Sequence, residues 1–267
     1  MSVTTTTDSR SSARPAKRKK GVIELLFEGR AFFALIAIVV TFSLMSPNYF
    51  TINNFLIMAS HVAIFGLLAI GMLLVILNGG IDLSVGSIFS LTGMVTALAM
   101  ANGFDDITAS LAGLAVGIVF GAINGFLITL VGLAPFVVTL ITYAVAASLA
   151  FIVTNGRSLG VNSPNYWLLN SGEMIPGLPN FVLFCLIFTV ILEFVLRKVT
   201  AGRWFYSIGS SPMAAYLLGI PVKRTRFAAY VISGTMASFA GLLTVSYILN
   251  AEATAGASLM LQAIAAV

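Results

Sequence analysis

The chain has 267 residues, of which 59% are hydrophobic and only 9% are charged, whereas soluble domains carry roughly 25% charged residues. Its formal net charge is +5, from 14 basic and 9 acidic side chains, and these are too few to cover a soluble protein of this length. The composition therefore excludes a soluble globular domain and indicates an integral membrane protein.

The first 29 residues are predicted to form a basic, largely disordered segment on the cytoplasmic side. They are rich in Ser and Thr, and seven of the 14 basic residues lie between Arg10 and Arg30. Such a segment cannot bury enough apolar surface to fold. The basic cluster could bind anionic membrane lipid or simply fix the orientation of the chain, and we favour orientation.

The remainder, residues 30–267, is predicted to be a transmembrane domain: an all-α, polytopic integral membrane helical bundle. Each crossing of the hydrocarbon needs about 20 apolar residues, and charge-free runs of that order recur along the chain. About seven transmembrane helices are predicted, over residues 31–46, 56–77, 83–101, two helices within 107–156 split at 132–135, 181–196 and 227–249.

The distribution of charge predicts the orientation. Six basic residues lie between Arg197 and Arg226, and only Arg157 lies outside the two basic clusters. Basic residues accumulate on the cytoplasmic side, and six crossings return a chain with a cytoplasmic N-terminus to that side at 197–226. We therefore expect a multi-pass protein of the bacterial cytoplasmic (inner) membrane with these side chains outside: Asp105, Asp106, Arg157, Glu173 and Glu252.

The ten residues NGGIDLSVGS, from Asn78 to Ser87, are predicted to form a break between the second and third helices. Asp82 is the one charged residue between positions 31 and 104. A carboxylate in such a setting usually faces a bundle interior or a watery cavity, which is typical of transport. We expect the carboxylate to be satisfied locally by Ser84 and by the backbone amides of Gly79 and Gly80, and to stabilise the break between the helices. Contact with the solute is the weaker alternative. The candidate residues of the pathway or signature loop are Asn78, Gly79, Gly80, Asp82, Ser84 and Asn124.

Four glycines of the predicted fourth helix recur at every fourth position and so lie on one face: Gly113, Gly117, Gly121 and Gly125. Small residues at this spacing let neighbouring backbones approach closely, so this helix is predicted at the bundle centre. Asn124 beside them could line a pathway or clamp a neighbouring helix through a hydrogen bond, and we slightly favour the clamp.

A short cytoplasmic helix is predicted from Pro212 to Leu218, within the loop 197–226. Ser211 suits the N-cap and Pro212 the first helical position, while Gly219 suits the position after the end. The helix is unusually apolar, so it could rest on lipid or insert into a partner protein. The candidate residues for coupling this helix to a partner protein are Ser211, Pro212, Met213, Ala214, Ala215, Tyr216, Leu217, Leu218 and Gly219.

The sequence offers no motif for catalysis or for a cofactor. It has no phosphate-binding loop of the Walker type, no nucleophile elbow or HExxH motif, and no cluster with metal-ligand spacing; His61 and Cys185 each stand alone. We therefore expect no enzymatic activity, metal or cofactor in the chain itself, and no nucleic-acid partner. Energy for transport must come from an ion gradient or another subunit.

NGGIDLSVGS resembles the signature of the permease subunits of ribose-type monosaccharide ABC importers. The likeness extends over nearly the whole chain, through AIGMLLVILNGG, GLAPFVVTLIT, TNGRSL, the short inside helix and LQAIAAV. It implies one copy of a permease dimer, homomeric or heteromeric, that forms the pathway for a monosaccharide. An extracytoplasmic sugar-binding protein would deliver the sugar, and a separate ATP-binding-cassette ATPase subunit would drive transport.

The chain departs from the family pattern in the short inside helix. An acidic residue is usual in the family where this chain has Met213, and more polar residues are common at Tyr216 and Leu218. These changes make the helix more apolar and leave the helix itself in place. They bring into question a polar contact with the ATPase.

Two other functions stay open. Broken helices and an intramembrane carboxylate also suit an ion-coupled secondary transporter of a small polar solute, and a non-transporting scaffold is a weaker alternative.

We also expect an incomplete permease, because the apolar stretch from Leu259 to Val267 stops where the family continues into a Gly-rich segment and further helices. The pattern does not identify the sugar.

Overall fold

The computed structural model describes residues 30–267, so the predicted disordered segment 1–29 lies outside the described residues. The chain divides into two compact units, with the boundary between Asn54 and Phe55. In the first unit, helix α2 (Arg30–Met45) is followed by a turn and by the start of α3 (Ile52–Leu77). Helix α2 matches the helix predicted at 31–46 to within one residue at each end.

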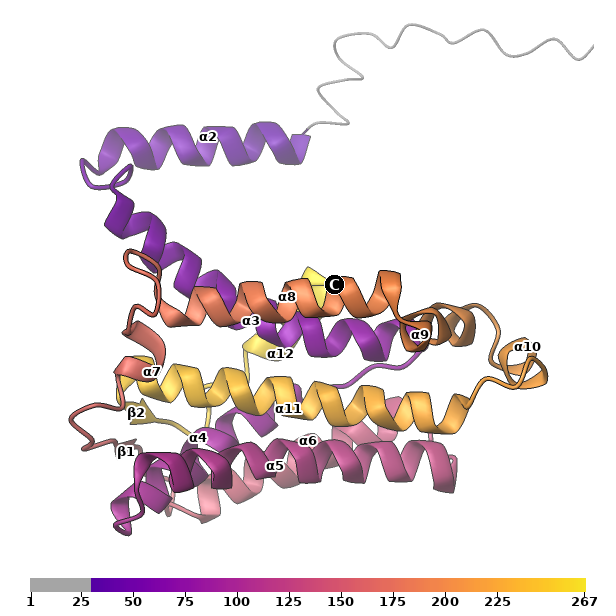
Figure 1. Ribbon diagram of the computed structural model, residues 1–267. Helices are drawn as coiled ribbons and strands as arrows, with labels where there is room; N and C mark the ends of the chain where they lie inside the picture. Colours follow the sequence, from indigo (N-terminus) through magenta and orange to yellow (C-terminus); the bar gives the residue numbers. More distant parts are fainter. Residues whose placement is uncertain (1–29) are drawn as a thin grey trace, which may run out of the picture. The chain divides into compact units, whose positions relative to one another are not determined.

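The second unit is a bundle of helices, and its described residues include only two short strands (Figure 1). This confirms the predicted all-α polytopic class. After α3, the elements are α4 (Val85–Ala101), α5 (Asp106–Phe126), the π-helical turn η1 (Leu127–Val131), α6 (Pro135–Ile152), β1 (Leu159–Gly160), α7 (Leu168–Ser171), α8 (Asn180–Lys198), α9 (Thr200–Ser210), α10 (Pro212–Leu217), α11 (Val222–Ile248), β2 (Asn250–Ala251) and α12 (Leu259–Ala266).

Seven apolar helices of the described residues correspond to the seven predicted ones. Five of them are long and apolar enough to cross a membrane: α3, α5 continued by η1, α6, α8 and α11. The other two, α2 and α4, are shorter apolar helices. Helix α4 is short because it begins only at Val85, after the irregular segment 78–84.

Helix α11 lies at the centre of the second unit. In its most apolar stretch 67% of the residues are buried, compared with 17% in α8. Its small residues Ala237 and Ala240, together with Leu243, join a core with Leu67 and Phe89 of α3 and α4. Its glycines allow close approach of neighbouring helices: a Cβ atom at Gly234 would meet the backbone of α5, and one at Gly241 would meet the backbone of α4 at Phe89.

The loops contain more regular structure than the sequence predicted. Residues 199–211, predicted as loop, contain the helix α9, and α11 begins five residues before the predicted start at 227. The segment 157–180 contains α7 and β1, which pairs with β2 in an antiparallel register of Leu159 with Ala251. Helix α9 forms because its apolar side chains Phe205 and Ile208 are buried on one face.

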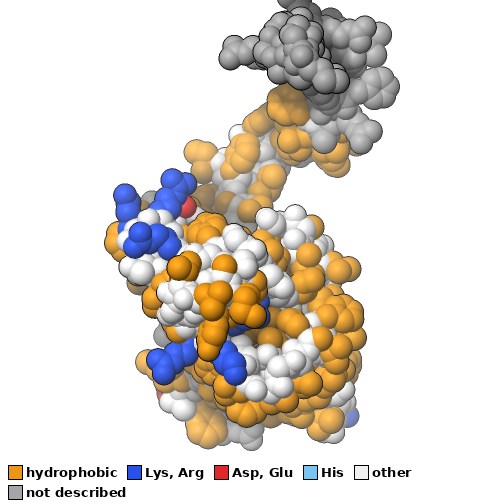
Figure 2. All heavy atoms as spheres, turned by 90° about the vertical axis from the view of Figure 1, so that its right-hand side faces the viewer, with side chains coloured by type: hydrophobic (Ala, Val, Ile, Leu, Met, Phe, Trp, Pro, Cys, Tyr) orange, Lys and Arg blue, Asp and Glu red, His pale blue; other side chains and the backbone are white. Residues whose placement is uncertain are grey.

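The two ends of the second unit differ in charge. The end with α9 and α10, here called the basic end, carries Arg197, Lys198, Arg203, Lys223, Arg224 and Arg226. The opposite end, here called the acidic end, carries α7, β1 and β2 and the charged residues Asp105, Asp106, Arg157, Glu173 and Glu252. Figure 2 looks onto the basic end and shows Lys and Arg side chains around a largely hydrophobic surface.

Candidate functional site

The segment between α3 and α4, residues 78–84, enters the bundle from the basic end. Arg226 Nη2 donates to the carbonyl oxygen of Asn78 at 3.3 Å, and Ser233 Oγ donates to the carboxylate of Asp82 at 2.8 Å. Ser233 follows Arg226 by seven residues on α11, which is about 10 Å along the helix. The segment therefore runs inward beside α11, and α4 begins in the interior. Irregular backbone at such depth is tolerated because protein surrounds it.

Three hydrogen bonds hold the fully buried carboxylate of Asp82. Its Oδ1 accepts from the backbone nitrogen of Ser84 at 3.0 Å and from Ser84 Oγ at 2.6 Å, while its Oδ2 accepts from Ser233. Asn124 Nδ2 in turn donates to Ser84 Oγ at 2.8 Å. We call Asp82, Ser84, Asn124 and Ser233 the Asp82 cluster. It ties the break to α5 and α11.

Sequence reasoning missed Ser233, and no signal in the sequence marks it. It is one of several hydroxyl residues on α11, and only the depth reached by the break brings it to Asp82. Asn124 was among the sequence-predicted residues, and its side chain donates to Ser84 Oγ, a contact of the kind that the clamp alternative describes.

The amides of Gly79 and Gly80 do not bond to Asp82. Gly79 N donates to the carbonyl of Ile76 at 2.8 Å and Gly80 N to that of Val75 at 3.0 Å, so both close the end of α3. Gly79 has a φ of +74°, which side-chain-bearing residues rarely adopt. The expectation that these amides serve the carboxylate is therefore wrong, because the chain turns back at Gly79 and Gly80 before it reaches Asp82.

The structure places the four α5 glycines on one buried face. A Cβ atom at Gly117 would meet Ser238 Oγ and the carbonyl oxygen of Gly234, and one at Gly121 would meet the backbone of Tyr230. At Gly113 it would meet Thr96 of α4, and at Gly125 it would meet Phe227. This face of α5 therefore lies in near backbone contact with α11, as small residues allow.

The short helix α10 lies at the basic end. Ser211 Oγ accepts from the backbone nitrogen of Ala214 at 3.3 Å as the N-cap, and Gly219 has a φ of +78° just after the end. The helix ends at Leu217, one residue before the predicted Leu218, which caps it. Ala215 is buried, whereas the large side chains are 68–79% exposed: Met213, Tyr216, Leu217 and Leu218.

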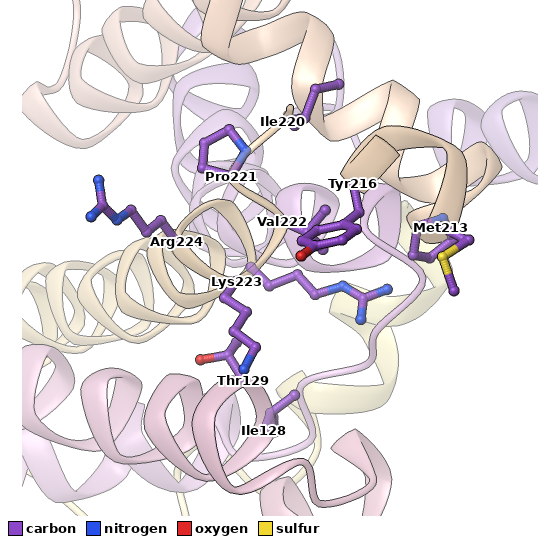
Figure 3. A pocket seen from close by; sticks show the side chains of 11 residues that line it. Ile128, Thr129, Met213, Tyr216, Ile220, Pro221, Val222, Lys223 and Arg224 are labelled. Carbon is purple, nitrogen blue, oxygen red and sulfur yellow. The ribbon is translucent and has the colours of Figure 1, made fainter. Parts of the chain in front are cut away.

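A cavity of about 770 Å³ lies between α10, the start of α11 and η1 (Figure 3). Its apolar wall includes Met213 and Tyr216 from α10 and Val222 from α11, and its basic residues are Lys223, Arg224 and Arg226. No acidic side chain lines it. The exposed apolar helix and this open cavity together form a surface on the basic end that could receive part of another protein.

A smaller cavity of about 170 Å³ lies next to the NGG turn. Its lining comes from three elements: the turn itself, the segment from η1 to α6, and α11. The residues are Asn78, Gly79, Gly80, Ile128, Pro135, Arg226 and Tyr230. It shares Ile128 and Arg226 with the larger cavity, so the two lie side by side. Arg226, Tyr230 and Ile128 were not among the sequence-predicted site residues.

Ionisable side chains with a structural role also occur at the acidic end. Asp105 caps α5, and the hydrogen bonds from the side chain and amide of Thr108 hold the pKa of its carboxyl below the ordinary value. Burial raises the pKa of Tyr166, whose hydroxyl lies 3.2 Å from Ser110 Oγ. Within residues 30–267 as described, no group of three or more His, Cys, Asp or Glu side chains could hold a metal ion.

Comparisons with known proteins place the sequence in a family. The sequence profile of the family described as branched-chain amino acid transport system / permease component matches residues 54–267. The chain is 62% identical over 234 residues to the probable ABC transporter permease protein y4mJ of Sinorhizobium fredii, covering 88% of this chain and 70% of that protein.

Two further relatives are named for sugars. The ribose import permease protein RbsC of Bacillus subtilis is 38% identical over 88% of this chain and 74% of its own length. The D-allose transport system permease protein AlsC of Escherichia coli is 36% identical over 88% of this chain and 72% of its own length. No solved structure matches the chain.

Proposed function

Because this chain belongs to the family of permease components of the branched-chain amino acid transport system, and is a transmembrane permease subunit of an ABC importer, we propose that its cargo is a monosaccharide. The observation that carries the proposal is the similarity to permeases named for ribose and D-allose over most of the chain. The same relatives favour ATP-driven import over the ion-coupled carrier, the main alternative from the sequence.

The proposal includes three protein partners. A separate ATP-binding-cassette ATPase supplies the energy, since the sequence has no phosphate-binding loop of the Walker type. An extracytoplasmic sugar-binding protein delivers the sugar to the acidic end, and a second permease copy, identical or related, completes the pathway. The ATPase docks at the basic end, where the apolar helix α10 is exposed beside a cavity of about 770 Å³.

The orientation follows from the charge bias. With the basic end in the cytoplasm, the six basic residues between Arg197 and Arg226 lie inside, as the positive-inside rule requires. We infer that each of the six apolar helices before α9 crosses the membrane once, which puts the N-terminus in the cytoplasm as well; these helices are α2, α3, α4, α5, α6 and α8.

In this proposal the Asp82 cluster fixes the break and does not bind the sugar. All three hydrogen bonds to the carboxylate come from the protein, and the side chain is fully buried. Specificity then comes mainly from the binding protein.

Reconstitution tests the cargo. The permease would be co-expressed with its cognate ATPase and second permease, placed in proteoliposomes and supplied with the loaded binding protein. Uptake of a labelled pentose or hexose should require hydrolysable ATP inside the liposome. Uptake that persists without ATP and follows an ion gradient would support the carrier instead, and ATP-driven uptake of leucine but of no sugar would contradict the proposed cargo.

The coupling role of α10 has its own test. Ala214 is exposed on α10, so Ala214→Arg should insert normally yet reduce ATPase co-purification and uptake at least tenfold, because the bulky charge obstructs docking. Ser210→Arg, at an exposed position at the end of α9, is the matched control. If Ala214→Arg retains the ATPase and its response to loaded binding protein, α10 is not the docking element.

A further inference from the structure

The smaller cavity near the NGG turn combines irregular backbone with polar side chains at the inner end of the bundle. Gly79 turns the chain with positive φ, and the π-helical turn η1 brings Ile128 to the opposite wall. Single π-helical turns occur frequently at functional sites. The cavity therefore lies where the backbone departs from the regular helices of the bundle.

Two polar atoms of this cavity lack partners. Asn78 and Tyr230 are only 4% and 3% exposed, and Asn78 Oδ1 and the hydroxyl of Tyr230 have no hydrogen bond within the described part of the chain. Asn78 Nδ2 is already used, since it donates to the carbonyl of Leu74 at 2.9 Å. Buried polar atoms without partners are rare in native proteins, so each needs an explanation.

Arg226 adds hydrogen-bond donors to the same cavity. Its Nη2 donates to the carbonyl of Asn78, which leaves other N–H groups of the planar guanidinium for a ligand. No acidic residue lines this cavity or the larger one beside it. The cavity thus offers donors from Arg226, an acceptor from Asn78 and a hydroxyl from Tyr230 that can do both.

We propose that this cavity is a binding station for one monosaccharide ring at the inner end of the pathway, with Asn78 Oδ1, the Tyr230 hydroxyl and the Arg226 guanidinium bonded to sugar hydroxyls. The inference rests on the proposed sugar cargo. A volume of about 170 Å³ suits one sugar ring. It equals the volume that roughly six water molecules occupy in the liquid, at about 30 Å³ each. Neighbouring hydroxyls of a sugar present donors and acceptors together, as the three protein groups do.

The position of the cavity gives the station a place in transport. It lies between the Asp82 cluster and the larger cavity at the basic end, with which it shares Arg226 and Ile128. A sugar held here has passed the Asp82 cluster and faces the end proposed to be cytoplasmic.

The test removes one hydroxyl. Tyr230→Phe should lower ATP-driven uptake of the loaded sugar about threefold to tenfold, the effect of one lost hydrogen bond. Membrane level and ATPase co-purification should stay unchanged, because in the empty protein the hydroxyl has no partner to lose. The matched control is Tyr247→Phe, which removes a hydroxyl from a more exposed tyrosine at the other end of α11. Uptake by Tyr230→Phe equal to that of the parent protein would overturn the inference.

Deoxy sugars separate a direct contact from an indirect effect. Each analogue would be delivered on the same binding protein. The uptake by Tyr230→Phe divided by the uptake by the parent protein would be compared across the analogues, so that the preference of the binding protein cancels. For the analogue lacking the hydroxyl bonded to Tyr230 the ratio should return to about one. A ratio that is the same for every analogue would overturn the station. Absence of sugar uptake by the parent protein would instead refute the proposed cargo.

Discussion

At the scale of single residues, Asp82 illustrates how a carboxylate can be kept inside a membrane protein. Sequence reasoning could locate it, because it stands alone in a long charge-free stretch, and it could foresee Ser84 as a partner. It could not foresee Ser233, which is 151 positions away and meets Asp82 only through the packing of α11. Local partners are readable from the sequence, and distant ones depend on the fold.

The hydrogen bonds of Asp82 predict graded effects of substitution. Asp82→Ala should strongly lower the membrane level and thermal stability, because it leaves the donors of Ser84 and Ser233 without an acceptor in the interior. Ser233→Ala removes only one bond to the carboxylate and should cost about 1.5–3 kcal/mol. Thermal unfolding in detergent checks the order. Normal stability of Asp82→Ala would show that the cluster does not hold the break.

Asp105 predicts a pH dependence at the acidic end. Because hydrogen bonds from Thr108 lower the pKa of its carboxyl below 3.8, the stabilisation is present at neutral pH and is lost as the pH falls through the folded-state pKa. Asp105→Ala should therefore be less stable than the parent protein at pH 7, and the difference should shrink as the pH falls below about 4. Parallel melting curves over that range check this, and a constant difference would contradict it.

At the scale of elements, the contact of α5 with α11 depends on the absence of side chains. The every-fourth-residue spacing of the glycines could be read from the sequence, but the partner helix could not, since several helices carry small residues. The helices themselves were predictable because charge-free runs of about 20 residues have few alternatives. The strands β1 and β2 were not, because two residues each carry no periodic pattern.

Gly117 gives the sharpest test of this contact. Gly117→Val should destabilise the protein by about 1–3 kcal/mol, because the added atoms would overlap the backbone of Gly234. Ala115→Val is the control, since it enlarges an exposed position on the same helix. Membrane level and thermal unfolding would be compared for the two variants, and equal behaviour would argue against close packing at Gly117.

At the scale of the whole molecule, the orientation can be tested with the single native cysteine removed. In a Cys185→Ser background, Ser210→Cys at the end of α9 should react with a membrane-impermeant maleimide only from the cytoplasmic side. Ser158→Cys, in the exposed segment before β1, should react only from outside. Labelling of right-side-out and inside-out vesicles measures both, and the reverse pattern would place the basic end outside.

The composition alone was sufficient for the membrane class, and the charge bias was sufficient for a predicted orientation. The small cavity beside the NGG turn was not predictable, because Arg226 and Tyr230 lie about 150 positions after Asn78. Their meeting depends on how deeply the segment 78–84 runs along α11. The membrane class and the orientation depend on local composition and could therefore be predicted from the sequence. The cavity depends on how deeply the segment 78–84 enters the bundle and could not.

The interior start of α4 has an electrostatic consequence. A helix carries the equivalent of about half a positive charge at its N-terminus, from the macrodipole of its aligned peptide groups. In α4 this partial charge lies inside the bundle, and the side chain of Asp82 accepts a hydrogen bond from the amide of the N-cap residue Ser84 beside it. The break therefore places a hydrogen-bonded acceptor of the protein itself at the positive end of α4, so the field of this helix is met inside the bundle by Asp82.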